Sequence, residues 1–291
     1  MKLSPALVPY FQVAPLTLVL LVFLLVPLTM IITVSFFDLD VITGVIPTFT
    51  LLNYQELFGA LFDGGITWAL YVSTIKFAAI VWAITLTIGF TVAYFLVFHV
   101  RSLLVAIGLF LLCTVPFWTS NIIRMISWIP LLGKEGLFNQ GLQGLGIVDE
   151  PILFLLFSDF AVIVAYVHLF TLFMMVPIFN SMARIDKSLL EAAVDGGASR
   201  IGVMLEVVIP LSRTGIALGS IFVIALVMGD FFVIKVMSGG RSGSVASAMF
   251  DDISLLFYPP AGASAVLLLV IVTLMVTAIL RIVDVRKELS G

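Results

Sequence analysis

The sequence is short of charged residues, cysteine and histidine, and each shortage excludes a class of protein. Only 11% of its 291 residues are charged, whereas a soluble domain typically carries about 25%, so a water-soluble globular protein is excluded. The one cysteine, Cys113, cannot form an internal disulfide, and its apolar neighbours predict a small buried side chain. With two histidines and no metal-like spacing of His and Cys, no metal site is predicted.

Motifs for catalysis and nucleotide binding are also missing. The chain has no Gly-x-x-x-x-Gly-Lys-Ser/Thr segment, the pattern that surrounds phosphate groups with backbone N–H groups. It has no suitably spaced serine and histidine, and no paired carboxylates inside an apolar run. Its 14 basic and 17 acidic residues give no basic excess for nucleic-acid binding. The chain is therefore predicted to be neither an enzyme nor a nucleic-acid-binding protein, with no catalytic residues.

Long apolar runs, by contrast, occupy most of the chain. A helix needs roughly 20 mostly apolar residues to cross the hydrocarbon layer of a membrane. The runs predict an all-α, polytopic membrane protein with six transmembrane helices in one domain, residues 1–291. The predicted helices are 13–36, 69–98, 103–123, 153–180, 214–234 and 261–283. The first is far longer than a signal-peptide core and lacks a cleavage pattern, so it is interpreted as a retained span.

The distribution of basic residues predicts which ends of these helices face the cytoplasm. If both termini lie on one side, nine of the 14 basic residues lie there as well. These nine are Lys2, Arg101, Arg184, Lys187, Arg200, Arg213, Arg281, Arg286 and Lys287. The opposite loops are mainly acidic. Because cytoplasmic loops carry an excess of Lys and Arg, both termini and the loop 181–213 are predicted to be cytoplasmic.

The loop 181–213 carries signals for short helices of its own. Ser188 and Glu191 have the spacing of a capping box, in which each side chain satisfies a backbone N–H that the other leaves exposed. This pattern predicts a helix over 189–195. Gly196-Gly197 is expected to end that helix, because glycine adopts the left-handed conformation that closes a helix.

A second short helix is predicted to follow, capped by Ser199 and running to Pro210. Two short helices joined by a glycine turn form a rigid elbow. On the first helix, Leu189, Leu190 and Ala193 offer a compact apolar face that fits the groove of a partner protein. The alternative interpretation is an amphipathic helix that lies on the membrane surface.

The spacing of residues along this loop is more specific than its helix signals. Glu191-Ala192-Ala193 is followed after three residues by Gly197 and, nine residues later, by Val207-x-Ile209-Pro210. This arrangement resembles the EAA loop of the permease subunits of ABC importers. The resemblance implies that the loop is a coupling helix, which docks into a cleft on an ATPase subunit. The implied coupling residues are Glu191, Ala192, Ala193, Asp195, Gly197 and Pro210.

The resemblance extends over nearly the whole chain. The segments 115–124, 136–139 and 190–199 are similar to those of the spermidine/putrescine type of permease. The resemblance implies the MetI-like fold of type I ABC importers in the inner (cytoplasmic) membrane of a bacterium. It also implies two ATP-binding subunits that hold ATP and Mg, a second, non-identical permease subunit, and a periplasmic or extracellular substrate-binding protein. No cofactor is expected in this chain itself.

One segment, Met237-Ser238-Gly239-Gly240-Arg241, resembles the signature sequence of ABC ATPases. The predicted topology places it outside the cytoplasm, where there is no ATP. It is therefore interpreted as a glycine-rich turn between helices, and the energy for transport must come from a separate ATPase.

Charged residues inside apolar runs are candidates for the substrate path, because burying them in a membrane is costly. Asp230 lies in the fifth predicted helix beside Phe231 and Phe232, and a carboxylate next to aromatic faces suits a cation. Lys235 follows near the outer end of that helix, and its pairing with Asp251 would form a breakable latch over the outer mouth. The alternative is a structural aspartate bonded to a neighbouring helix, with a snorkelling lysine and solvated acids.

Other single residues carry less specific signals. Trp118 is interpreted as an interfacial anchor, and Trp118 and Arg124 are candidate docking residues for the substrate-binding protein, with Arg124 placed to meet a carboxylate of that protein. Lys76 is close enough to the outer interface to snorkel, and His168 is interpreted as a hydrogen-bonded packing residue. Gly215-x-x-x-Gly219 permits a close helix approach, either at a subunit contact or within the chain.

Two alternative functions remain open from the residues. An ion-coupled secondary transporter would also have six helices and an intramembrane acid, although it would not need the capped elbow and would usually show internal repeats. The second alternative is an ABC permease for a different small solute, such as an amino-acid derivative.

Overall fold

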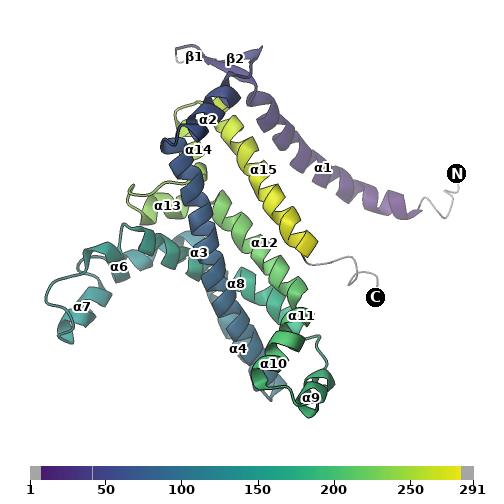
Figure 1. Cartoon of the computed structure of the whole chain (residues 1–291). Coiled ribbons are helices and arrows are strands. Elements are labelled where there is room, and N and C mark those ends of the chain that lie inside the picture. The colour runs from purple at the N-terminus through teal and green to yellow at the C-terminus, as the bar shows by residue number, and fades with distance from the viewer. Residues whose placement is uncertain (1–7, 41, 283–291) are drawn as a thin grey trace. The chain divides into compact units, whose positions relative to one another are not determined.

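The computed structural model describes residues 8–40 and 42–282, and most of these residues form α-helices (Figure 1). The chain divides into two compact units, residues 1–68 with 248–270 and residues 69–247 with 271–291. The predicted all-α class is confirmed, with one small addition, a hairpin of two strands. That residues 1–291 form a single transmembrane domain stays a prediction.

The first unit begins with a long helix and a hairpin. It contains α1 (Val8–Val34), β1 (Phe37–Asp40), β2 (Gly44–Phe49), α2 (Leu52–Phe62), most of α14 (Val245–Ser254) and the first half of α15 (Tyr258–Ile282). The Asp40 carboxylate accepts the backbone N–H groups of Ile42 and Thr43 at the hairpin turn, which lowers the pKa of Asp40. The Asn53 amide donates to the carbonyls of Ser35 and Phe37 and so fixes α2 against the hairpin.

The second unit contains the longer chain of helices. Its elements are α3 (Ile66–Tyr94, from residue 69), the π-helix η1 (Phe95–His99), α4 (Leu103–Thr114), η2 (Val115–Trp118), α5 (Asn121–Ile126), α6 (Trp128–Leu132), α7 (Leu137–Gly144), η3 (Leu153–Leu155), α8 (Asp159–Met182), α9 (Lys187–Asp195), α10 (Arg200–Val203), the π-helix η4 (Met204–Val208), α11 (Ile209–Leu211), α12 (Arg213–Gly229), α13 (Phe232–Met237) and the end of α15.

Helix α8 forms the core of the second unit. Tyr166, Met174 and Ile178 on this helix are fully buried. Gly219 of α12 and Gly89 of α3 both lie against Met174, so close that a Cβ atom at Gly219 would be 2.8 Å from its sulfur. Small residues at these crossings let three helices pack backbone to backbone, which is the main way helices associate within a membrane.

In the part of the chain that the structure describes, four helices are long and apolar enough to cross a membrane, and two bent pairs of helices reach that length when each pair is taken as one span. The four are Gln12–Val34, Ile66–His99, Asp159–Met182 and Tyr258–Arg281. The bent pairs are Leu103–Trp118 with Asn121–Gly144, at 92°, and Arg200–Leu211 with Arg213–Gly229, at 68°. Six spans, the predicted number, are reached when each bent pair counts as one span.

Two predicted helices have the wrong bounds. The helix predicted over 103–123 ends at Trp118, and the chain resumes at Asn121 in a new direction. Pro116 lies in the last turn, which tightens to a 3₁₀-helix because proline provides no backbone donor. The helix predicted over 153–180 begins only at Asp159, because the Ser158 hydroxyl caps it by accepting the N–H of Ala161.

The prediction of a continuous helix over 214–234 is also wrong. Helix α12 ends at Gly229, and Asp230 is extended, with φ −86° and ψ 129°. Outside this break the predicted bounds are closer to those observed. The first span begins at Val8, before its predicted start, and the last begins at Tyr258.

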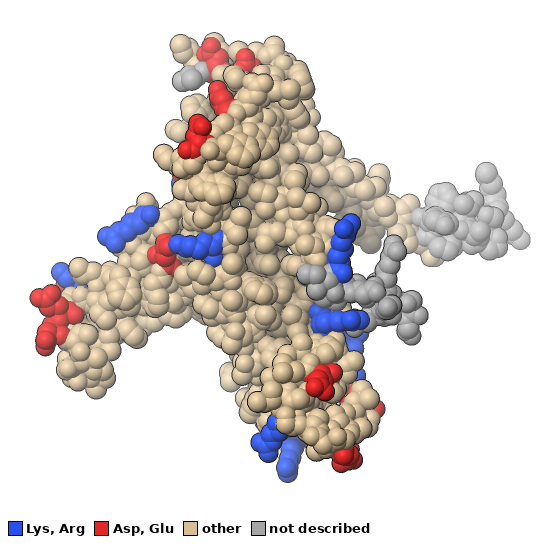
Figure 2. All heavy atoms as spheres, viewed as in Figure 1, with Lys and Arg blue, Asp and Glu red and all other residues tan. Residues whose placement is uncertain are grey.

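The prediction for the orientation of the termini rests partly on Lys2, Arg286 and Lys287, which lie outside the described residues. Figure 2 shows Lys and Arg side chains at the end of the second unit formed by α9, α10 and the start of α12. Cys113, predicted to be buried, is exposed on α4, because no other part of the described chain covers that face.

Candidate functional site

The first helix of the loop 181–213 is capped by a residue that the sequence pattern does not single out. Helix α9 begins at Lys187, and its cap is Asp186, whose carboxylate accepts the N–H of Ser188 at 3.0 Å. The predicted capping box of Ser188 and Glu191 is therefore wrong. Ser188 lies inside the first turn and acts as a donor. The bond lowers the pKa of Asp186 below its ordinary value of 3.8, so the cap stays ionised at neutral pH.

The end of α9 and the start of the next helix follow the sequence prediction. Gly197 has φ +88°, and its N–H donates to the carbonyl of Val194, while the N–H of Ala198 donates to that of Ala193. These two bonds form a Schellman motif. Ser199 then caps α10 by accepting the N–H of Gly202 at 3.1 Å. The predicted glycine turn is confirmed.

The second helix of the elbow is not a regular α-helix. It starts as α10, widens to the π-helix η4 and ends in α11, where Pro210 stands in the first turn. Proline offers no N–H to the preceding turn, which favours such a local change of hydrogen-bonding pattern. A bend of 68° then leads directly into α12 at Arg213.

The apolar face of the elbow differs from the predicted one. Leu190 and Ala193 are half-buried, whereas the exposed large apolar side chains of the elbow are Leu189, Val194, Ile201, Leu205 and Leu211. The implied coupling residues Glu191, Ala192, Asp195, Gly197 and Pro210 are all exposed. A docking surface here combines carboxylates with apolar side chains from both helices.

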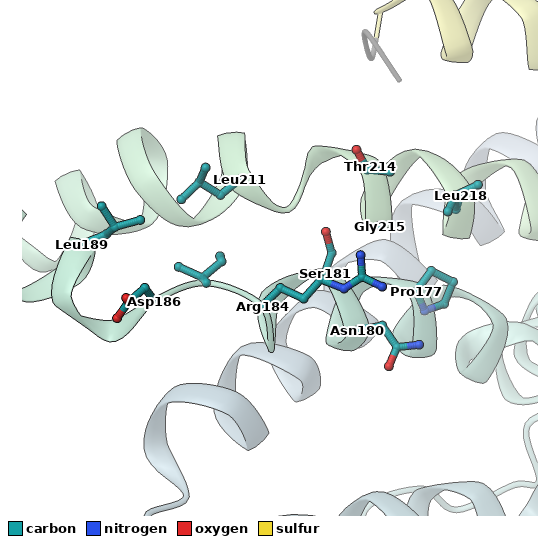
Figure 3. A pocket seen from close by; sticks show the side chains of 11 residues that line it. Pro177, Asn180, Ser181, Arg184, Asp186, Leu189, Leu211, Thr214, Gly215 and Leu218 are labelled. Carbon is teal, nitrogen blue, oxygen red and sulfur yellow. The ribbon is translucent and has the colours of Figure 1, made fainter. Parts of the chain in front are cut away.

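A pocket of about 630 Å³ lies behind the elbow (Figure 3). Helices α8 and α12 form two of its sides, and Leu189 and Leu211 lie at the end nearer the elbow. Arg184 and Asp186 also line it. Because the elbow, the end of α8 and the start of α12 share this space, a shift of the elbow changes the packing of both helices.

The Asp186 cap can be tested directly. Replacing Asp186 with Ala should raise amide hydrogen exchange in the first turn of α9 about fivefold, the usual cost of a lost cap. Asp186→Asn should preserve the protection, because an amide oxygen also accepts the bond. Ser188→Ala should have a smaller effect, because it keeps the backbone N–H that Asp186 accepts and loses only the hydroxyl contact with Asp186. If Ser188→Ala lost this protection from exchange and Asp186→Ala kept it, the result would support the capping box of Ser188 and Glu191 instead.

The candidate substrate path centres on the break between α12 and α13. The Asp230 carboxylate accepts the N–H of Val233 at 2.8 Å and the hydroxyl hydrogen of Tyr166 at 3.2 Å. Asp230 thus caps the first turn of α13 and is fixed to α8. Neither contact is an ion pair, so Asp230 keeps its negative charge available to a ligand.

A pocket of about 300 Å³ opens at this break. It is lined by Asp230 and Phe232 from one broken helix and by Asn121 from the other, at the start of α5. The break between α4 and α5 and the break between α12 and α13 therefore each contribute a polar side chain to one pocket. Non-helical backbone at membrane depth is tolerated where it lines a cavity, and a carboxylate, an amide and an aromatic ring together suit an organic cation.

Of the other residues predicted to line the substrate path, only Phe232 lines the pocket of Asp230. The rings of Phe231 and Phe232 lie 6.3 Å apart at 81°, and of the two only Phe232 lines this pocket. Lys235 stands in α13 of the second unit, and Asp251 belongs to the first. The latch formed by these two residues therefore stays a prediction.

Lys76, which is predicted to lie near the outer interface, forms an ion pair. Its Nζ lies 2.6 Å from Asp159 at the start of α8, and the Asp159 carboxylate also accepts the hydroxyl of Ser242. This contact fixes the loop after α13 to α3 and α8. Sequence reasoning missed Asp159, although an acid just after a capping serine is a typical helix start.

The two predicted docking residues, Trp118 and Arg124, differ in how exposed their side chains are. Trp118 is 80% exposed, but Arg124 is only 6% exposed, with its guanidinium over the Phe117 ring and bonded to Asn121. Arg124 is thus closed to a docking protein in this conformation, and that prediction rests on Trp118 alone. His168 accepts the indole N–H of Trp128 at 3.0 Å, which confirms its interpretation as a hydrogen-bonded residue.

The signature-like segment forms a turn. Gly239 and Gly240 have φ +60° and +79°, and the Ser238 hydroxyl accepts the N–H of Gly240. Within the described residues, no three His, Cys, Asp or Glu side chains are grouped to hold a metal ion.

A capped elbow joined to broken membrane helices defines a transport subunit, and comparison with known proteins gives its family. The chain is 34% identical over 262 residues to the spermidine/putrescine transport system permease protein PotB of Escherichia coli K12, covering 88% of this chain and 90% of that protein. PotB of Haemophilus influenzae is 32% identical over 222 residues, 76% of this chain and 75% of that protein. The inner membrane ABC transporter permease YdcU of E. coli is 30% identical over 213 residues, covering 68% and 65%.

Solved structures agree on the fold. Two structures of a bacterial ABC transporter that imports alginate match 94% of this chain at 15% identity. One has a TM-score of 0.75 and is matched over 94% of its own chain. The other has a TM-score of 0.73 and is matched over 92% of its own chain. No family model matches the chain. The chain belongs to the permease subunits of ABC importers, in the spermidine/putrescine type. It is a multi-pass protein of the bacterial inner membrane.

Proposed function

We propose that this permease carries polyamines such as spermidine or putrescine into the cytoplasm. The observation that carries the proposal is the Asp230 carboxylate, which lines the pocket at the break of α12 and α13 and forms no ion pair with residues 8–40 or 42–282. A polyamine presents ammonium groups on an apolar chain, and the pocket offers one carboxylate beside apolar and aromatic walls. The printed function of the PotB relatives supports the same substrate class.

The partners follow from the same family. Two ATP-binding subunits supply the energy and hold ATP and Mg, so this chain needs no cofactor. A substrate-binding protein delivers the polyamine to the outer face, and a second, non-identical permease completes the path. Both termini lie in the cytoplasm with the elbow, which meets the ATP-binding subunits through Glu191 and the exposed apolar side chains.

Helix α12 links the elbow to the path. It begins just after α11 and ends at Gly229, next to Asp230, and its 17 residues span about 25 Å. ATP binding closes the two ATPase subunits and moves the elbow, and α12 passes that motion to the break where Asp230 and Phe232 line the pocket. The cavity then changes the side on which it opens.

The substrate can be tested on the complete transporter in liposomes. Labelled spermidine or putrescine should enter only when ATP is inside and the binding protein is outside. Selective uptake of an amino-acid derivative would instead identify the alternative solute class. Uptake by the purified chain alone, driven by a proton or sodium gradient, would contradict the whole assignment.

Gly197 tests the coupling role of the elbow. Gly197 has φ +88°, and an added Cβ atom would have no neighbour within 4 Å, so backbone strain is the main expected effect of Gly197→Leu. The strain of about 1–2 kcal/mol should reopen the turn and lower uptake about five- to thirtyfold, with membrane insertion unchanged. Gly196→Ala is the matched control, because Gly196 has an ordinary φ of −73°. Normal uptake by Gly197→Leu would show that the turn does not transmit force.

A further inference from the structure

A groove of about 540 Å³ lies in the second unit, on a face apart from the substrate path. Helices α3, α12 and the end of α15 form its walls, with Ala79, Ile216 and Ala278 among the lining residues. None of its lining residues belongs to the pocket of Asp230 or to the pocket behind the elbow.

The groove offers a ligand almost no hydrogen-bonding groups. The indole N–H of Trp82 donates to the Ser220 hydroxyl at 2.8 Å, and that hydroxyl donates to the carbonyl of Ile216 at 2.7 Å. These bonds occupy the polar atoms of the two polar residues in the middle of the groove. What remains is an apolar channel that suits a hydrocarbon chain, since burying an unpaired polar group would be costly.

One charged residue, Arg213, also lines the groove. It is the first residue of α12 and is exposed, and its guanidinium makes no hydrogen bond or ion pair with any residue in 8–40 or 42–282. Another cation, Arg281, lies in the last turn of α15. A guanidinium without a partner favours a phosphate group, which it binds through two parallel hydrogen bonds.

The length of the groove matches one leaflet of a membrane. Its lining on α12 runs from Arg213 to Ile224, a rise of about 16 Å at 1.5 Å per residue. The hydrocarbon core is about 30 Å thick, so the groove covers about half of it. A lipid whose head group meets Arg213 would thus have room for one acyl chain along the groove.

We propose that the groove binds an anionic phospholipid, with its phosphate on Arg213 and one acyl chain between α3, α12 and α15. Charge selects the lipid: a zwitterionic head group carries its own cation, which competes with Arg213 for the phosphate. Juxtamembrane Lys and Arg residues attract anionic lipids in the same way. Because α12 joins the elbow to the path, a lipid in this groove would stabilise the helix that carries the motion.

The test is native mass spectrometry of the complete transporter, purified in detergent and supplied with either phosphatidylglycerol or phosphatidylcholine. The wild-type transporter should retain more phosphatidylglycerol than phosphatidylcholine. Arg213→Gln should lower its retention about tenfold or more, the usual effect of losing a charge-assisted bond, and Arg213→Lys should restore part of it. Ala278→Phe should lower retention of both lipids by filling the groove.

Matched controls separate the groove from general surface charge and bulk. Arg281→Gln removes a nearby cation that does not line the groove, and Ala83→Phe adds the same ring on an exposed part of α3 outside it. Both should retain lipid as the wild type does. Any of three results would overturn the proposal. The wild type could retain the two lipids equally, or Arg213→Gln could retain phosphatidylglycerol as the wild type does. Arg281→Gln could also lose as much bound lipid as Arg213→Gln. A cross-link from Ala278→Cys to the partner permease would overturn it too, by showing that protein covers the groove.

Discussion

Asp230→Asn should lower polyamine uptake about ten- to a hundredfold while leaving the permease folded. The amide oxygen of asparagine still accepts the N–H of Val233 and the hydroxyl of Tyr166, so the cap and the contact with α8 persist. What is lost is the negative charge facing the pocket. A hydrogen bond to a charged group contributes about 1.5–3 kcal/mol, which corresponds to the stated change in uptake. Uptake and substrate-stimulated ATP hydrolysis by the complete transporter measure it.

Two further variants show whether charge or position matters at this site. Asp149→Asn removes an exposed carboxylate outside the pocket and should transport normally. Tyr166→Phe leaves the charge but frees Asp230 from α8, so its effect on uptake should be smaller than that of Asp230→Asn. If Asp230→Asn imports polyamine at the wild-type rate, the carboxylate has only the structural role of capping α13.

How far the sequence predicts this structure depends on how local the interactions are. The turn at Gly197 and the cap at Ser199 are predictable, because each motif is complete within about six residues of chain. The helix break at Asp230 is not predictable from hydropathy. The apolar run continues on both sides of it, and hydropathy carries no information on the direction of the backbone. The Gly229-Asp230 pair was the available signal, since glycine ends helices and aspartate begins them.

Other features depend on contacts between distant residues. Lys76 and Asp159 are 83 positions apart, and nothing in the pattern around either residue indicates the other. Arg124 has the sequence surroundings of an interfacial cation, but tertiary packing places it under Phe117. The choice of Asp186 over Ser188 as the cap of α9 also depends on where the chain leaves α8, since both residue types are good caps.

The glycines of α12 allow a prediction of the largest effect on stability. A Cβ atom at Gly215 would lie 2.6 Å from the Cβ of Ser181 and nearer still to the carbonyl oxygen of Pro177. At Gly219 the nearest atom is the flexible sulfur of Met174, at 2.8 Å. A Cβ at Gly219 would also lie 2.9 Å from the backbone carbonyl oxygen of Met174. Because the contacts at Gly215 are shorter, Gly215→Ala should destabilise the permease more than Gly219→Ala, by about 1–3 kcal/mol or more.

Gly229→Ala is the control on the same helix, because a Cβ there meets nothing within 4 Å. Thermal unfolding of the purified permease should fall in the order Gly229→Ala, Gly219→Ala, Gly215→Ala, with about 2–4 °C lost per kcal/mol. The comparison also separates the two interpretations of the Gly-x-x-x-Gly pattern. Contact within the chain predicts a lower melting temperature for the isolated subunit. If Gly215→Ala left that temperature unchanged and only weakened assembly with the partner permease, the glycines would serve a subunit contact, and α8 would have to move away from α12 in the complex.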